Sequence, residues 1–511
     1  MAEQIINERY SDDFLNNEVK EFALYTIKTR ATLGLMDGLR LGARKIIHGG
    51  LTKTFKGSKS SGYVKYTSLM GAAFDNEYDH GDASLKNTIE QFSSRHVLKL
   101  APFKTDGQIP TLRDNSIDTA ARYLSVGASD YLDLYSVDMD LLTYNFESEK
   151  WVEPKFFLPL LPMGLLYRTT SPGFGIGYNG FSYNLYDVVS AVQQSIITGT
   201  CIGLSEINLK PDVYGIDPDK IIYNASKDQW FNIGDYKIIG NSLHIIDLPY
   251  HINNIKAYTD YLDKLVTKGI ILEYFDRSTD KINVECVFAH GRLQQQLAAS
   301  KFKFFNQFKL IKKIPNNNYN FVDVNERIVS FDSPNEYLDY FVKRRLEFFE
   351  KRRMKLIKDL TQERNEKQHL MDFIQAVVDE KLIITRRSKS DILTDIRKMG
   401  LTEEGLKLSI SRLDNDSIQK LKEEILEIDE LLDFYKKTTP KDMYLSDLID
   451  LMESKFRVDI INPNNTVTTM LSAYDDNGWS EFDTDDIAAK PTRKKRRTTA
   501  SKSKSTKPIK I

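Results

Sequence analysis

The stretch Asp118-Thr-Ala-Ala-Arg-Tyr-Leu-Ser-Val126 is the key to this chain, because it places Arg122 directly before Tyr123 and after two small residues. This arrangement is expected of a tyrosine nucleophile beside a phosphate-binding cation. A phenol has an ordinary pKa of about 10 and must be activated before it attacks, and a guanidinium stabilises both the phenolate and the charge on phosphorus. The chain contains 26 tyrosines, most of which we expect to pack or cap, so the pair needs support from the surrounding sequence.

Length and composition indicate a protein of several domains. With 511 residues, the chain exceeds the roughly 250–300 residues at which a single core stops growing. No apolar run approaches the about 20 residues needed to cross a bilayer, and the first residues do not resemble a secretion signal. Cys201 and Cys286 lie in apolar, strand-like sequence without metal or redox spacing, so we expect both to be buried in a reducing compartment.

Charge is distributed unevenly along the chain. Lys490–Ile511 holds ten Lys and Arg residues and no acid, so a net charge of −1 leaves about −11 for the other residues. Between Lys28 and Lys65 the only acid is Asp37, and this basic region predicts a surface for phosphate, although a solvated helical face explains it equally well. We expect residues 461–511, acidic and then basic, to be disordered and to serve as a DNA tether or a nuclear localisation signal.

Local patterns near the N-terminus predict short helices separated by turns. We expect helices at about Asn17–Thr29, Lys65–Phe74 and from Ala83 onward, the first with Val19, Phe22, Ala23 and Ile27 on one face. Asp37-Gly38 marks a turn, after which Arg40, Arg44 and Lys45 stand beside Ile46 and Ile47. The pattern is typical of a helix-turn-helix DNA-binding region. On its own, the placement of His80 beside Asp82 is consistent with three roles for His80: a metal ligand, an acid–base group or a turn residue.

Further blocks occur in the order found in type IIA DNA topoisomerases, and together they resemble that family over about residues 20–355. The blocks are Met36-Asp-Gly-Leu-Arg-Leu-Gly-Ala-Arg-Lys-Ile-Ile47, Lys65-Tyr-Thr-Ser-Leu-Met-Gly71, His80-Gly-Asp82, Asp106-Gly-Gln108, Ala120-Ala-Arg-Tyr123, Phe157-Leu-Pro-Leu-Leu-Pro-Met-Gly164, Gly173-Phe-Gly-Ile-Gly177 and Leu243-His-Ile-Ile-Asp-Leu-Pro-Tyr250. The chain resembles the subunit that cleaves and rejoins DNA, similar to the separate subunit of tailed-phage enzymes.

The resemblance implies roles for individual residues. Tyr123 matches the nucleophile that joins a 5′ phosphate of DNA, Arg122 its neighbour, Arg30 an arginine near the phosphate in the partner's active site, and His80 a nearby histidine. The matching DNA-binding residues are Arg40, Arg44, Lys45, Lys65 and Phe174. Phe174 stands where the family has an isoleucine that wedges between base pairs. The alternative interpretation is that the Phe174 side chain packs into the core of the tower domain.

The chain also departs from the family pattern. Met36 and Leu41 stand where the family has an arginine and a proline. Tyr78-Asp79 stands where the family has His-Pro or His-His before the histidine that matches His80. Asp79 brings an acid near the expected cleavage site, which leaves the assignment of an acid or base there open.

The implied fold is an α+β multidomain protein. We expect a winged-helix (helix-turn-helix) DNA-cleavage domain at 1–155, an α/β tower domain at 156–333, and antiparallel coiled-coil arms with a small helical dimerisation gate at 334–460. The disordered tail would follow at 461–511. Within the arms, the apolar stripe is Leu338, Val342, Phe349, Leu356 and Leu360, with a returning helix marked by Ile418, Leu421, Ile425, Ile428 and Leu431.

Two family signatures are not found in this sequence. The Glu-Gly-Asp-Ser block of the Mg²⁺-binding domain and a glycine-rich nucleotide motif are missing, and Asp138-Met-Asp140 stands in the wrong place in the family's order to be the metal pair. The resemblance therefore implies no metal site in this chain, with Mg²⁺ and ATP bound by a partner subunit. It further implies a homodimer that acts on double-stranded DNA, away from membranes, in the bacterial cytoplasm or nucleoid, or in a nucleus if the host is eukaryotic.

The function expected from the resemblance is breakage and reunion in an ATP-dependent type II DNA topoisomerase. The alternative from another class is a noncatalytic DNA-bridging scaffold with the same architecture. A tyrosine recombinase is a third possibility, disfavoured because the sequence has no His-x-x-Arg with dispersed arginines.

Overall fold

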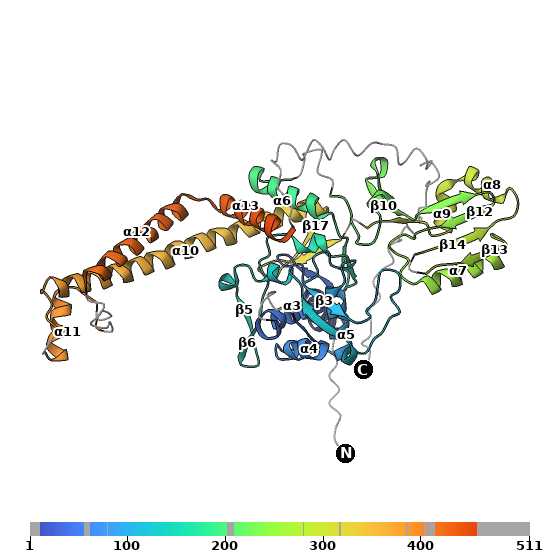
Figure 1. Cartoon of the computed structure of the whole chain (residues 1–511). Coiled ribbons are helices and arrows are strands. Elements are labelled where there is room, and N and C mark those ends of the chain that lie inside the picture. The colour runs from blue at the N-terminus through green and yellow to red at the C-terminus, as the bar shows by residue number, and fades with distance from the viewer. Residues whose placement is uncertain are drawn as a thin grey trace, which may run out of the picture. The chain divides into compact units, whose positions relative to one another are not determined.

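The computed structural model describes residues 11–55, 62–78, 80–201, 209–279, 281–315, 318–384, 387–402, 406 and 414–456. The chain forms two compact units, one of Met1–Phe341 with Met452–Ile511 and one of Val342–Leu451. Both helices and strands are present, as expected for an α+β protein (Figure 1). None of the helices in the described ranges is long and apolar enough to cross a membrane. The predicted tail at 461–511 lies outside the described residues.

The first helical segment begins earlier than predicted, and few of its side chains are buried. α1 (Ser11–Phe14) and α2 (Lys20–Thr26) are joined and followed by π-helical turns at Leu15–Val19 and Ile27–Ala31. Ile27 is buried, but Phe22, which the sequence assigned to the same face, is 60% exposed. Its ring instead contacts the ring of Phe174, with 6.1 Å between centroids.

Three helices and a small sheet form the region that carries Tyr123. The helices are α3 (Leu41–Gly49), α4 (Tyr66–Phe74) and α5 (Asp82–Ser93), and the sheet is antiparallel in the order β2 (Tyr63–Lys65), β4 (Ser125–Ala128), β3 (Phe103–Asp106). α4 and α5 confirm the predicted helices. Their apolar side chains, including Leu69, Leu85 and Ile89, are fully buried with Ile47 of α3, as helical spacing requires.

Two hairpins and a returning strand complete this part of the first unit. The hairpins are β5 (Tyr144–Glu147) with β6 (Lys150–Pro154) and β7 (Thr169–Ser171) with β8 (Tyr178–Gly180). β1 (Leu33–Gly34) pairs in parallel with β16 (Tyr319–Val322), which pairs antiparallel with β17 (Ile328–Phe331). α6 (Leu185–Thr198) follows, and Asn184 caps it by accepting hydrogen bonds from the backbone N–H of Tyr186 and Asp187.

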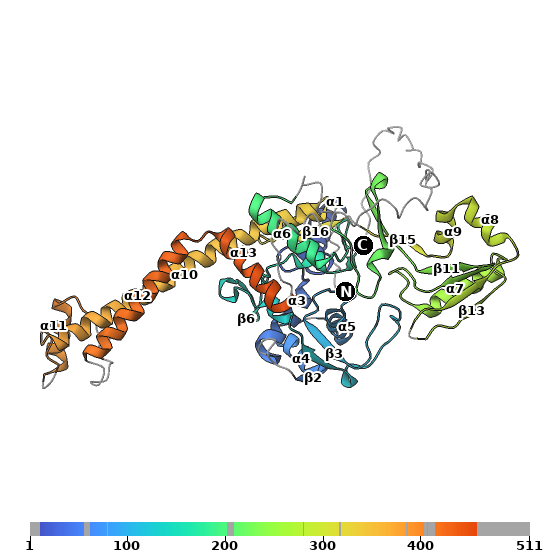
Figure 2. The ribbon, with the colours of Figure 1, turned by 45° about the horizontal axis from the view of Figure 1, so that its top comes forward.

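Two further sheets confirm the mixed α/β pattern expected after α6 (Figures 1 and 2). One has the order β15 (Ile311–Lys313), β10 (Gln229–Ile233), β9 (Ile221–Asn224), and the other β11 (Tyr236–Ile239), β12 (Ser242–Ile245), β14 (Val284–Val287), β13 (Glu273–Asp276). α7 (Ile255–Thr267), α8 (Arg292–Ala299) and α9 (Lys301–Gln307) share one apolar cluster with the second sheet. Cys286 lies buried in β14 as expected. Cys201 is also buried, but it lies in a bend after α6 rather than in a strand.

The second unit is built on two long helices that run in opposite directions. α10 (Pro334–Val378) enters it from the first unit and is followed by α11 (Lys389–Lys398), α12 (Asn415–Lys437) and α13 (Pro440–Leu451). Arg353 donates to the carbonyl of Tyr435, whereas Lys367, later in α10, pairs with Glu424, earlier in α12. The two helices are therefore antiparallel (Figure 1).

The predicted apolar stripes of these helices are mostly buried, with one error. Phe349 of α10 and Ile418, Ile425 and Ile428 of α12 are buried. Leu431 is 46% exposed, and Leu432 takes its place on the buried face. Leu432 lies one heptad after Ile425, so it is the residue that returns to the same side of the helix.

Candidate active site

Tyr123 lies on a short turn that directly precedes β4, the central strand of its sheet. Ala121–Tyr123 forms one 3₁₀ turn, in which the Tyr123 N–H donates to the Ala120 carbonyl at 2.9 Å. The Tyr123 side chain is 70% exposed, whereas the next residue, Leu124, is fully buried. The turn thus presents the phenol to solvent from a backbone that is held in place by its neighbour.

Contacts from two directions fix this turn. The N–H of Tyr66, the first residue of α4, donates to the Leu124 carbonyl at 3.2 Å. Gly107 has a φ of +118°, and a Cβ there would lie 2.7 Å from Leu124 Cδ2, so this position needs glycine. The backbone around Tyr123 therefore has little room to shift.

Two cations lie near the phenol, one beside it in the sequence and one across the sheet. The Arg122 guanidinium carbon lies 6.0 Å from the centroid of the Tyr123 ring. Lys65 is exposed, and its Cα is paired with that of Ser125 across β2 and β4. α4 begins at the residue after Lys65, and the amino end of a helix attracts anions. A phosphate beside Tyr123 would be met by two cations and a helix terminus.

A second group of predicted residues gathers at the β7–β8 hairpin. Arg40 donates from Nη2 to Thr169 Oγ1 at 3.0 Å, and Ser171 Oγ donates to the Arg30 carbonyl at 3.1 Å. Phe174 lies in the loop of this hairpin and is 55% exposed. That exposure contradicts the alternative in which Phe174 packs into a core.

His80 lies just before α5, where it is exposed and stands edge-to-face against Tyr78 with 5.5 Å between ring centroids. Within the described residues, no hydrogen bond or ion pair joins Tyr123 to His80 or to Arg30. Arg122 and Lys65 thus lie around the turn that carries Tyr123, and Arg30, Arg40 and Phe174 lie at the β7–β8 hairpin. Asp79 lies outside the described residues.

Residues 30–452 match the family of the DNA gyrase/topoisomerase IV A subunits. The chain belongs to this family of type IIA topoisomerases. It is 26% identical over 470 residues to mitochondrial DNA topoisomerase 2 of Dictyostelium discoideum, covering 86% of this chain and 35% of that protein. It is also 26% identical over 513 residues to DNA topoisomerase 2 of Arabidopsis thaliana, covering 88% of this chain and 33% of that protein. The chain thus spans about a third of the length of these relatives.

The fold is similar to that of a solved topoisomerase structure. The crystal structure of the DNA-binding, cleavage and re-ligation domain of Plasmodium falciparum topoisomerase II superposes with a TM-score of 0.71 at 21% identity, covering 91% of this chain and 66% of that one.

Two residues of the family's first motif do not lie where a DNA contact requires. Arg44 and Lys45 are buried, and this placement argues against their predicted role as DNA-binding residues. Arg44 forms a two-pronged pair with Asp37, at 2.7 Å from Nε and 3.2 Å from Nη2. Lys45 Nζ lies 2.9 Å from Glu147 and 3.1 Å from Glu153. A phosphate would have to displace carboxylates of which Asp37 and Glu153 are fully buried, so we expect both cations to stabilise the structure.

Sequence reasoning missed a buried cation beside the Tyr123 segment. Lys86 of α5 is buried, and its Nζ lies 2.6 Å from Asp118 Oδ1 and 3.3 Å from Glu90 Oε1. Burial opposes the ammonium charge, but the contacts with Asp118 and Glu90 outweigh it and raise the pKa of Lys86. The only signal in the sequence was the i, i+4 spacing of Lys86 and Glu90 beside the apolar stripe of α5.

Other titratable groups near the turn are poor candidates for the nucleophile. Tyr66 is fully buried, and burial raises its pKa to about 12. In the described part of the chain, no group of three or more His, Cys, Asp and Glu side chains could hold a metal ion. The residues present there do not fit a Mg²⁺ site.

The burial of the Arg44–Asp37 ion pair predicts how substitution of Arg44 affects stability. Arg44→Gln should lower the free energy of unfolding by about 3–5 kcal/mol, because it leaves the Asp37 carboxylate buried without a cation. Lys65→Gln, at an exposed position, should change it by less than about 0.5 kcal/mol. Urea unfolding followed by circular dichroism measures both. An Arg44→Gln chain of unchanged stability but weaker DNA binding would restore the DNA-contact role.

Proposed function

We propose that this chain is the breakage–reunion subunit of a type IIA DNA topoisomerase, with Tyr123 as its nucleophile. The observation that carries the proposal is the exposed phenol on a fixed turn, beside Arg122, Lys65 and the amino end of α4, in a chain of this family. The matched relatives are named DNA topoisomerase 2, and they supply the reaction class.

In the proposed reaction, the Tyr123 oxygen attacks a DNA phosphorus and gives up its proton to the surroundings. The bond to the 3′ oxygen breaks, and that oxygen leaves with a proton as a 3′ hydroxyl. Arg122 and Lys65 offset the negative charge on the phosphoryl oxygens. The phosphotyrosyl bond conserves the energy of the broken bond, so the 3′ hydroxyl can reverse the attack after a second duplex has passed.

The residues that stay apart from Tyr123 fit a homodimer. Arg30 is exposed, and within the described residues no hydrogen bond joins it to Tyr123 of its own chain, so it is free to serve as the arginine that the resemblance assigns to the partner's active site. We infer that α3–α5 with the β2–β4–β3 sheet form the winged-helix domain at 1–155, and that residues 156–333 form the tower. α10 and α12 would then be the coiled-coil arms, with α11 at the dimerisation gate.

The proposal assigns ATP and Mg²⁺ to another chain. The described residues do not fit a metal site, and the sequence contains no glycine-rich nucleotide motif. We therefore propose a partner subunit that binds both. The alternative, a noncatalytic DNA-bridging scaffold, is disfavoured by the exposure of Tyr123 beside Arg122 on a fixed turn, which a scaffold does not require.

Tyr123→Phe should abolish covalent capture of DNA and leave DNA binding unchanged, because only the nucleophilic oxygen is removed. The test incubates supercoiled plasmid with the enzyme purified through a tag on this chain, in Mg²⁺, and traps cleavage with detergent and protease. Tyr63→Phe is a matched control, since Tyr63 is also an exposed tyrosine of this sheet. Linear plasmid with protein-linked ends from Tyr123→Phe would refute the assignment.

Phe174→Ala should reduce DNA bending and cleavage together while lowering stability by no more than about 1 kcal/mol, because an exposed wedge contributes little to folding. Energy transfer between dyes on the two DNA ends measures the bend, and thermal melting measures stability. Normal bending by the variant would show that Phe174 is not a wedge.

A further inference from the structure

The segment that ends at Tyr123 is a long connection that needs anchors. It runs from the end of β3 at Asp106 to the start of β4 at Ser125, and its only regular element is the turn at Ala121–Tyr123. A connection of this length has many conformations unless contacts restrict it. The position of the Tyr123 oxygen therefore depends on what holds the middle of the segment.

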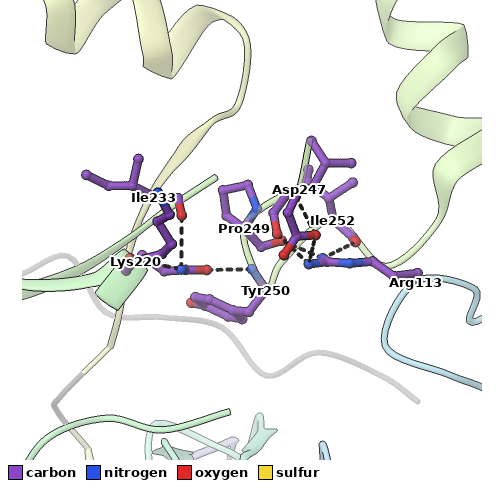
Figure 3. Close-up of polar contacts among 9 residues, drawn as sticks. Arg113, Lys220, Ile233, Asp247, Pro249, Tyr250 and Ile252 are labelled. Carbon is purple, nitrogen blue, oxygen red and sulfur yellow. Dashed lines mark hydrogen bonds and ion pairs between the residues drawn. The ribbon is translucent and has the colours of Figure 1, made fainter. Parts of the chain in front are cut away.

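Arg113 holds that middle to a distant loop. Its Nη1 donates to the carbonyls of Pro249 at 3.1 Å and Ile252 at 3.3 Å, and its Nη2 donates to Asp247 Oδ1 at 2.7 Å and the Leu248 carbonyl at 2.6 Å (Figure 3). We call these five residues the Arg113 clamp. Both terminal nitrogens are occupied by protein acceptors, so they are not available to a DNA phosphate.

The loop that receives Arg113 is itself fixed. The Tyr250 N–H donates to Asn232 Oδ1 at 2.7 Å, and Asn232 Nδ2 donates to the Lys220 carbonyl at 3.2 Å (Figure 3). Asn232 belongs to β10, so the clamp ends on a sheet rather than on a free loop.

The neighbours of Arg113 are held to the same region. Leu112 is buried in an apolar cluster with Phe181, Trp230 and Ile314. The Asn115 N–H donates to the Asn253 carbonyl at 2.9 Å. Closer to Tyr123, Asp118 is tied to Lys86 of α5, which leaves four residues between that contact and the nucleophile.

We propose that Arg113 is a positioning residue for Tyr123. It fixes the position of the nucleophile relative to the sheet β15–β10–β9. The inference rests on the proposed function. Attack on phosphorus needs the two atoms within about 3–3.5 Å, and an error of about 1 Å can cost a hundredfold in rate. Arg113 would act through this constraint and not by touching DNA.

Arg113→Lys tests the proposal because it keeps the charge but cannot reach four separated acceptors. Arg292→Lys, at an exposed position in α8, is the matched control. Asp247→Asn is a second variant that weakens the clamp from the other side and keeps the shape of the loop. Each is made in the full chain and purified with its partner through a tag.

The assay uses a duplex labelled at both 5′ ends, with enzyme in excess and Mg²⁺ present. It measures DNA affinity, the rate of covalent capture, its pH profile and the positions of the cuts. Amide hydrogen exchange of the chain is measured at Asn115 and Tyr123.

Arg113→Lys should lower the capture rate about 10- to 100-fold, spread the cut positions and speed exchange at both amides. DNA affinity and the shape of the pH profile should not change. Asp247→Asn should act in the same direction, and Arg292→Lys should have no effect.

Faster exchange with an unchanged capture rate and sharp cuts would overturn the positioning role. Loss of DNA affinity in proportion to the capture rate would overturn it too, since Arg113 would then be a DNA contact. If the unsubstituted enzyme captures no DNA, the proposed function is wrong, and so is the role of Arg113. This failure is seen without any substitution, whereas a failure of the Arg113 proposal alone is seen only in the variants.

Discussion

The buried carboxylate of Asp37 is the interaction on which the rest of the site depends. It is fully buried and accepts hydrogen bonds from Arg44 and from the backbone N–H of Leu39 and Phe157. An unpaired charge in this position would cost several kcal/mol, so the three donors must stay together. They come from α3, from the turn before it, and from the chain that leads to the β7–β8 hairpin. One buried side chain thereby ties α3 to the segment that leads to the hairpin carrying Phe174.

This arrangement divides the charged residues of the family motifs by burial. Asp37, Arg44 and Lys45 are buried and paired, so they support the structure. Arg30, Lys65 and Arg122 are exposed and remain available to phosphate. Solvent exposure also separates Tyr123 from buried tyrosines such as Tyr66, whose pKa burial raises to about 12. The chemistry we propose therefore depends on a few exposed groups mounted on a framework of buried ion pairs.

Much of the fold could be predicted from the sequence because the information is local. Apolar spacing identified α4, α5, α10 and α12. Leu431 was assigned to the buried face in error, because a helix position is decided by its partner helix as well as by spacing. Arg44 and Lys45 were assigned to DNA because sequence does not show that Asp37, Glu147 and Glu153 meet them. Arg113 had no signal at all, since its acceptors lie more than 130 residues away in the chain.

The central claim is that the Tyr123 oxygen becomes covalently joined to a 5′ phosphate of DNA. The most direct measurement is mass spectrometry of the peptide that keeps a nucleotide after detergent trapping and digestion with nuclease and protease. Our account predicts one modified peptide, with the 5′-linked nucleotide on Tyr123. A nucleotide on another tyrosine, or one attached through its 3′ phosphate, would contradict it.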